Sequence, residues 1–186
     1  GANAVLKAFR AAGIRVPRVV FNPASGRRRT ARGVVVTLGT YNPNAHTVTM
    51  NGGSNANTVV HEMIHGLTSR GIIRIERIAS GRLGATAQQR QDAQDALALL
   101  RELHGMLRNS AGDRSYYGNT DLHEMLAEML SPDFLALAMQ TPMSALSPAA
   151  QRALDSTYNE VGNRTVFDAV VKAVMKIIDL IAPGNK

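Results

Sequence analysis

The stretch Val59-Val60-His61-Glu62-Met63-Ile64-His65-Gly66-Leu67 decides how the rest of the chain is interpreted. Its apolar residues recur at spacings of three and four, which predicts an amphipathic helix with one buried face. His61 and His65 are four residues apart, so a helix places both on one face with Glu62 beside them. Two imidazoles at this spacing next to a carboxylate are typical of a zinc site in which the carboxylate is the general base. We therefore expect His61 and His65 to bind one zinc ion and Glu62 to activate water.

The flanking residues predict where this helix begins and ends. Asn55 or Asn57 can cap its start, and Gly71 predicts its end. Upstream, Gly52 and Gly53 predict a turn after a strand at residues 46–51. A strand followed directly by the metal helix is the order expected of a peptidase cleft.

A catalytic zinc site normally has three protein ligands, so a third must come from elsewhere in the chain. The continuation HExxHxxGxxH is excluded, because Thr68 and Gly71 stand where it needs a glycine and a histidine. Within a second segment, residues 117–128, Thr120 or Asn119 could cap a helix that carries Glu124 and Glu128 one turn apart on one face.

The third ligand can be weighed from residue types alone. Asp121 and His123 are the alternatives to Glu124. His123 lies about 100 degrees around the helix from Glu124, so these two side chains cannot aim equally well at one ion. Glu124 is the preferred third ligand.

The segment also carries a resemblance to a known family. Tyr117 precedes Glu124-Met125-Leu126-Ala127-Glu128 by seven residues, and together with HExxH this pattern resembles the protease domain of anthrax lethal factor and the related Pro-Pro endopeptidases. The resemblance covers about residues 57–71 and 116–134. It implies that His61, His65 and Glu124 bind zinc, that Glu62 is the general base, that Tyr117 supports the oxyanion and that Glu128 orients a zinc-bound imidazole. On the residues alone, the neighbouring Tyr116 could take the place of Tyr117.

The same segment, with Ser131-Pro132-Asp133-Phe134, is also similar to zincin-like domains embedded in large polyvalent phage proteins. The resemblance therefore does not imply toxicity. It is compatible with a piece of a larger parent chain, with a secreted or injected effector and with a phage-borne protein, and the compartment stays open.

Length and composition predict one domain over residues 1–186, since a chain with 45% hydrophobic residues can bury a substantial core without metal or disulfides. The absence of cysteine excludes thiol catalysis and a disulfide framework. We expect an α+β, zincin-like fold with a small N-terminal mixed sheet and a mostly helical C-terminal part. The predicted strands are residues 18–21, 33–41 and 47–51, and further helices are predicted at 3–12, 86–108, 120–130, 133–140, 148–160 and 165–181.

The strand at residues 47–51 is expected to pair with an extended polypeptide substrate through Thr47, Val48 and Thr49. No signal peptide is expected, because the apolar run at residues 5–9 is too short. No membrane span is expected either, since the apolar C-terminal helix has sixteen residues and four charges.

The net charge of +7 suggests an alternative from another class. Arg27, Arg28, Arg29 and Arg32 cluster between two predicted strands and could grip the phosphates of a nucleic acid. No aromatic residues are interleaved with them for base stacking, which argues against this role. A solvated hairpin tip, or attraction of an acidic substrate or a parent chain, accounts for them as well. A zinc-binding interaction module without catalysis is a further alternative.

Two other histidines are not expected to bind metal. His104 falls within the predicted helix at 86–108, whose buried stripe is made of leucines, and is interpreted as a surface residue. His46 follows a turn-forming stretch and opens a strand, so it is interpreted as a residue that flanks a hairpin.

Overall fold

The computed structural model describes residues 15–30, 33–112, 114, 116–129, 131–154 and 165–181. The chain falls into two compact units, residues 1–70 and 71–186. Helix α2 (Ala56–Ala79) contributes to both, because the boundary lies within it. The predicted helix at residues 3–12 lies outside the described residues. That the whole chain acts as one domain stays a prediction.

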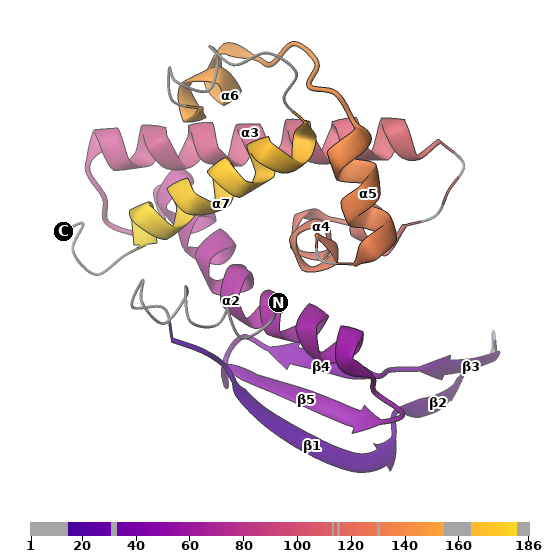
Figure 1. Cartoon of the computed structure of the whole chain (residues 1–186). Helices are drawn as coiled ribbons and strands as arrows, with labels where there is room; N and C mark the ends of the chain where they lie inside the picture. Colours follow the sequence, from indigo (N-terminus) through magenta and orange to yellow (C-terminus); the bar gives the residue numbers. More distant parts are fainter. Residues whose placement is uncertain are drawn as a thin grey trace. The chain divides into compact units, whose positions relative to one another are not determined.

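The first unit contains a three-stranded mixed sheet in the order β1-β5-β4. Strand β5 (Thr47–Gly52) lies in the middle, parallel to β1 (Arg18–Ser25) and antiparallel to β4 (Gly39–Asn42). Within this unit the beginning of α2 lies over one face of the sheet (Figure 1). Val48 and Met50, two residues apart on β5, are 0% and 3% exposed, and Thr47 and Thr49 beside them are only partly buried. One face of β5 is therefore covered, as the alternation of side chains along a strand allows.

A second, two-stranded sheet interrupts the predicted strand at residues 33–41. Strand β2 (Arg27–Thr30) pairs antiparallel with β3 (Gly33–Val36), so three of the clustered arginines lie within a strand and not only at a hairpin tip. The chain leaves this hairpin at Thr37 and Leu38 before β4 begins. The Asn51 side-chain amide donates to the carbonyl of Thr37 at 2.8 Å, and the Asn51 N–H donates to the carbonyl of Leu38 at 2.8 Å. These bonds hold Thr37 and Leu38 outside both strands. The apolar residues at 33–41 did not predict this break.

Helix α2 begins as predicted but ends later. Asn55 caps it, since its Oδ1 accepts from the N–H of Thr58 at 2.9 Å. Gly71 does not end the helix, which continues to Ala79. The physical reason is the apolar stripe that follows: Ile72, Ile75 and Ile78 are 0%, 0% and 5% exposed, and their burial outweighs the weak helix propensity of one glycine.

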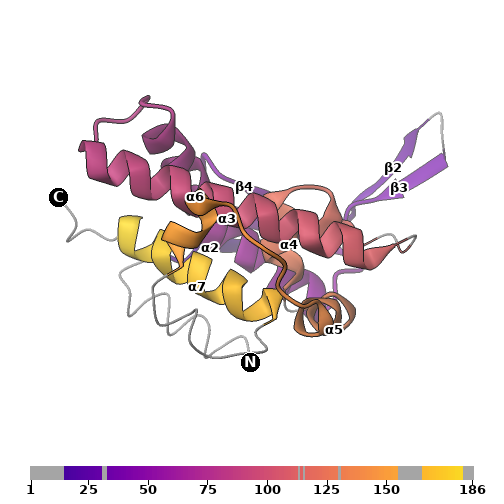
Figure 2. The same cartoon turned by 90° about the horizontal axis from the view of Figure 1, so that it is seen from above.

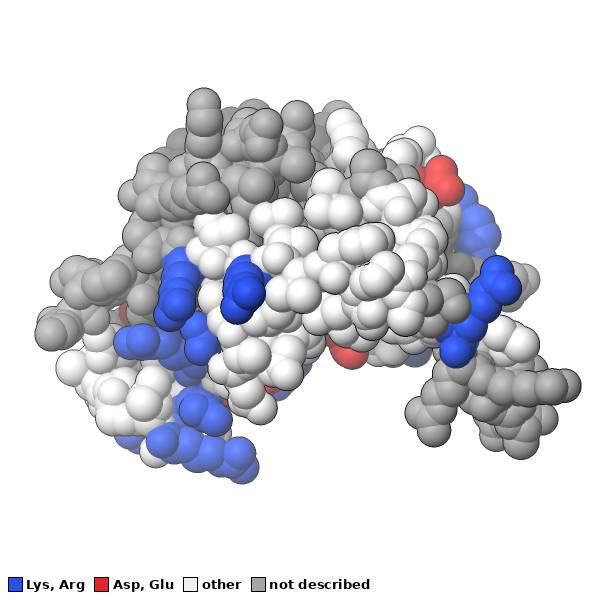
Figure 3. Space-filling model, turned by 90° about the horizontal axis from the view of Figure 1, so that it is seen from below, with Lys and Arg blue, Asp and Glu red and all other residues white. Residues whose placement is uncertain are grey.

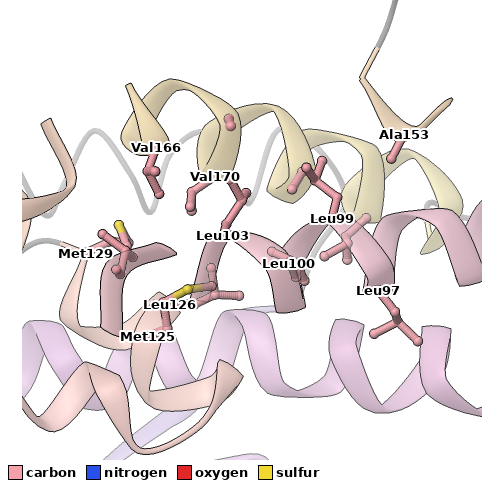
Figure 4. Close-up of a cluster of buried hydrophobic side chains, with 14 of the residues drawn as sticks. Leu97, Leu99, Leu100, Leu103, Met125, Leu126, Met129, Ala153, Val166 and Val170 are labelled. Atoms are coloured by element: carbon pink, nitrogen blue, oxygen red, sulfur yellow. The ribbon is translucent and has the colours of Figure 1, made fainter. Parts of the chain in front are cut away.

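The second unit is a helical assembly around α3 (Ala87–Ala111). Thr86 and Gln89 form the capping box that begins α3, and Gly112 follows its end. The structure confirms the predicted leucine stripe of α3, and α7 (Val166–Ile181) packs alongside α3 (Figures 1 and 2). Figure 4 shows side chains of α3, α4 and α7 meeting in this core. The remaining elements of the unit are η1 (Tyr117–Asn119), α4 (Leu122–Glu128), α5 (Pro132–Gln140) and α6 (Pro148–Ala153).

Two polar links tie α3 to the α6 segment. The Arg152 guanidinium donates to both carboxylate oxygens of Asp95 at 2.9 Å each. The Ser147 backbone N–H donates to Glu102 at 2.9 Å, and the Ser147 hydroxyl donates to the same carboxylate. Because Asp95 is 3% exposed, these bonds satisfy a carboxylate that would otherwise be costly to bury.

The fold class is therefore α+β, with a small mixed sheet and a mostly helical remainder, as the sequence predicts. The zincin-like assignment stays a prediction. None of the described helices combines the length and the apolar character that a membrane crossing requires.

Candidate metal centre

The two histidines of the HExxH segment lie on one face of α2, as the spacing predicts. The centroids of the His61 and His65 rings are 4.7 Å apart, with the ring planes at 77°. His65 is 9% exposed and His61 is half-buried. Two imidazoles this close can present nitrogens to a common point, which is what a shared ion requires.

Glu62 is 8% exposed and lies against the backbone of β4. A Cβ added at Gly39 would come within 2.5 Å of the Glu62 Cγ and 3.1 Å of its Oε1. Any side chain at this strand position would displace the carboxylate. Gly39 is therefore a residue of the site that the sequence interpretation missed. The available signal was a glycine within a strand pattern, which often marks a close approach of the backbone to another group.

The carboxylates of the second segment lie on α4 as predicted. Asp121 is the N-cap, and its Oδ1 accepts from the N–H of His123 at 2.8 Å and of Glu124 at 3.0 Å. Asp121 thus has a structural role, which accounts for its position without a metal. Glu124 and Glu128 follow one turn apart, and both are half-buried, unlike residues of a fully solvated helix face.

Among the described residues, His61, His65 and Glu124 form a group that could hold a metal ion, since one ligand atom from each lies within 4.8 Å of the others. This is the ligand set that the sequence predicts, and neither Asp121 nor His123 belongs to it. Two nitrogens and one carboxylate oxygen match the His₂Glu donor set of catalytic zinc, which leaves a fourth position open.

Of the two neighbouring tyrosines, Tyr116 is the one whose side-chain contacts the structure describes. Tyr116 packs against the core, with its ring centroid 5.7 Å from that of Phe134 and the Arg114 guanidinium carbon 5.6 Å from the Tyr116 centroid. Tyr117 begins η1, directly before Gly118, where an added Cβ would lie 2.6 Å from the Phe134 ring. The choice of Tyr117 over Tyr116 as the oxyanion donor stays a prediction.

His46 is occupied by structural hydrogen bonds. Its Nε2 bonds to the carbonyl of Arg15 at 2.6 Å, and its Nδ1 lies 2.8 Å from the Tyr41 hydroxyl. Burial raises the pKa of Tyr41, so the phenol keeps its proton and can donate to Nδ1. His46 therefore ties the start of the sheet to the preceding chain, consistent with its expected place outside the metal site.

His104 is half-buried on α3 and is not the exposed surface residue that the helix pattern suggested. Burial lowers the pKa of His104, and the backbone of Asn119 opposes part of this shift. The packing of η1 beside α3 explains the difference, because a sequence pattern does not say which helix positions a later segment will cover.

This histidine predicts a pH dependence of folding. Because its pKa is lower in the folded chain than the ordinary 6.5, His104 favours folding above that pH, and this contribution is lost as the pH falls through the folded pKa. We expect the free energy of unfolding of His104→Gln to depend less on pH between 7.5 and 5 than that of the parent. Urea titrations of the metal-free chains at both pH values measure this. Equal pH dependence in the two chains would contradict the assignment.

One predicted contact is wrong. Thr47, Val48 and Thr49 lie on β5, whose backbone pairs with β1 on one side and with β4 on the other. Because both edges are occupied, β5 cannot pair with an extended polypeptide, and the Val48 side chain is 0% exposed. Sequence order alone could not reveal that the strand before the metal helix is central. The edge beside Glu62 belongs to β4.

No family model, curated protein or solved structure matches the chain. The candidate site consists of a histidine pair on α2, the buried carboxylate of Glu62, which lies between the two histidines in sequence, and a half-buried carboxylate on α4.

Proposed function

We propose that the chain is a zinc-dependent endopeptidase. The proposal is carried by one observation, the group of His61, His65 and Glu124, with Glu62 directly after the first ligand in sequence. Two histidines and a glutamate suit zinc better than magnesium or calcium, which prefer oxygen ligands. A zinc ion held there would polarise the peptide carbonyl and lower the pKa of a water molecule.

The chain's own residues then have separable roles. Glu62 takes a proton from the attacking water while the water oxygen bonds to the carbonyl carbon. It then delivers this proton to the leaving nitrogen as the carbon–nitrogen bond breaks. The products are a carboxyl group and an amine. The Tyr117 hydroxyl donates a hydrogen bond to the carbonyl oxygen as negative charge develops there. Glu128 accepts from the second nitrogen of a ligand imidazole and fixes its orientation.

An extended polypeptide would lie along β4, the edge strand beside Glu62. Edge strands present unpaired backbone groups that a peptide can join by hydrogen bonds. Gly39 brings this edge directly against Glu62 without an intervening side chain. The scissile carbonyl would then pass close to the general base.

Two measurements test the proposal. Elemental analysis of the purified chain should find about one zinc per chain, as one ligand group predicts. The same preparation should cleave members of a peptide library, lose this activity in a chelator and recover it on addition of zinc. Bound zinc without any cleavage would favour the alternative of an interaction module without catalysis, and absence of zinc would contradict both.

Gly39→Ala is expected to lower peptide hydrolysis on the order of 100-fold, because a misplacement of about 1 Å at a reacting group can cost that much. The added methyl group must displace the Glu62 carboxylate. The proposed metal ligands are His61, His65 and Glu124, so the zinc content should be retained. Zinc content and kcat of the variant measure the two effects separately. Gly84→Ala is the matched control, since its Cβ would meet nothing within 4 Å. Equal losses in both variants would contradict a specific role for Gly39.

A further inference from the structure

The positive charge of the chain is concentrated in its first 70 residues. They contain nine Lys and Arg residues and one carboxylate, that of Glu62, whereas residues 71–186 contain twelve Lys and Arg and thirteen Asp and Glu residues. The first unit, which carries Glu62 and the histidine pair, thus accounts for the net charge of +7. On the face drawn in Figure 3, side chains of Lys and Arg are more widespread than those of Asp and Glu. A field of one sign attracts partners of the opposite charge.

Part of this charge lies on the arginine hairpin, strands β2 and β3. Arg27, Arg28 and Arg29 pair with Val36, Val35 and Val34 respectively. Arg27 is exposed, and Val34 and Val36 are 63% and 48% exposed. A two-stranded ribbon is marginally stable in water by itself, and exposed valines beside arginines make a surface that an anionic, partly apolar partner would cover.

The arginine hairpin is anchored to the sheet at its base. The Thr37 N–H donates to the carbonyl of Gly26 at 3.0 Å, and Asn51 holds the Thr37 carbonyl from β5. A Cβ at Gly26 would lie 1.9 Å from the Thr37 oxygen, so the two strands close tightly at this point. The base of the arginine hairpin is therefore held to the three-stranded sheet.

The arginine hairpin is also close in sequence to Gly39, which lies against the general base Glu62. Strand β3 ends at Val36, and β4 begins at Gly39, the residue that contacts Glu62. An extended chain advances about 3.3 Å per residue. A polypeptide that lies along β4 with its scissile bond at Glu62 would therefore reach the arginine hairpin after roughly three to six residues.

We propose that the substrate is an acidic polypeptide, with Asp or Glu about three to six residues to one side of the cleaved bond, bound by Arg27, Arg28 and Arg29 of the arginine hairpin. This inference rests on the proposed endopeptidase function. Guanidinium groups bind carboxylates by charge-assisted, often bidentate hydrogen bonds. A nucleic acid is the weaker occupant, because residues 27–36 include no aromatic side chain for base stacking.

The first test is cleavage of a proteome-derived peptide library at low salt. The parent should prefer Asp and Glu at these positions, and a variant with Arg27→Gln, Arg28→Gln and Arg29→Gln should lose the preference, with kcat/KM on acidic peptides falling tenfold or more, on the order of measured steering effects. A variant with Arg74→Gln, Arg77→Gln and Arg90→Gln removes the same charge from exposed positions of the second unit and should keep the preference. Circular dichroism checks that both variants fold. Cleavage with no acidic preference, or equal loss in both variants, would overturn the inference and leave the proposed function standing.

The second test measures binding without turnover. A Glu62→Gln chain should bind a fluorescein-labelled, glutamate-rich peptide more tightly than its glutamine counterpart, and the difference should shrink with salt and with the hairpin substitutions. If this binding appears while the parent cleaves nothing, the endopeptidase proposal fails and acidic-polypeptide recognition stands. If single- or double-stranded DNA binds more tightly than the acidic peptide through the same arginines, the substrate assignment is overturned.

Discussion

Glu62→Gln is expected to lower peptide hydrolysis by about 10²- to 10⁴-fold, the range that general base catalysis contributes. The amide keeps the shape of the side chain against Gly39 but cannot accept the proton of the attacking water. Because the proposed ligands are His61, His65 and Glu124, zinc content should be unchanged. The rate on a cleaved library peptide and elemental analysis of the same preparation measure both quantities.

Glu76→Gln provides the matched control, since Glu76 is an exposed glutamate farther along the same helix. It should hydrolyse peptides at the parent's rate. A Glu62→Gln chain that retained full activity would remove Glu62 as the base, and with it the proposed mechanism. A variant that lost its zinc as well would show that Glu62 helps to hold the metal site.

The helical elements of this chain were largely predictable because their signals are local. Asn55 before an apolar helix pattern, and Thr86 with Gln89, are capping arrangements that depend only on neighbouring residues. The end of α2 was not predictable in this way. Gly71 by itself predicts a helix end. The helix continues because Ile72, Ile75 and Ile78 are buried in a core with residues distant in sequence. Tertiary packing decided against the local signal.

The sheet shows a similar limit. The run of valines at the start of residues 33–41 predicts extended chain, and both β3 and β4 are extended. The break at Thr37 depends on Asn51, fourteen residues away, and the central position of β5 depends on pairing with β1 and β4. The local sequence pattern does not determine strand order or register. For this reason the predicted pairing of a substrate with residues 47–49 of β5 was wrong.

The residues of the site also differ in whether local sequence could predict them. The histidine pair follows from helical geometry once the helix is identified, and so does the shared face of Glu124 and Glu128. Gly39 could not be placed beside Glu62 without the register of β4. The sequence favoured Glu124 over Asp121 and His123 without excluding them, and the cap hydrogen bonds of Asp121 then gave that residue another role.

Loss of a ligand is the second large effect to be expected. His65→Ala should lower zinc affinity on the order of 100-fold or more, since even residues that only orient ligands contribute 10- to 100-fold. Peptide hydrolysis should fall with it. Glu124→Gln should act in the same direction, because a neutral amide oxygen is a much weaker zinc ligand than a carboxylate. Competition with a chromophoric chelator measures both affinities.

Asp121→Asn is the informative partner of Glu124→Gln, because each substitution removes one carboxylate charge from α4 and keeps the side-chain size. Asparagine remains a good N-cap, so the bonds to the N–H groups of His123 and Glu124 can persist and the helix should be retained. Zinc affinity should therefore stay near that of the parent. If Asp121→Asn lost zinc while Glu124→Gln kept it, the third ligand would be Asp121, and the α4 face that carries Glu124 would have no part in the metal centre.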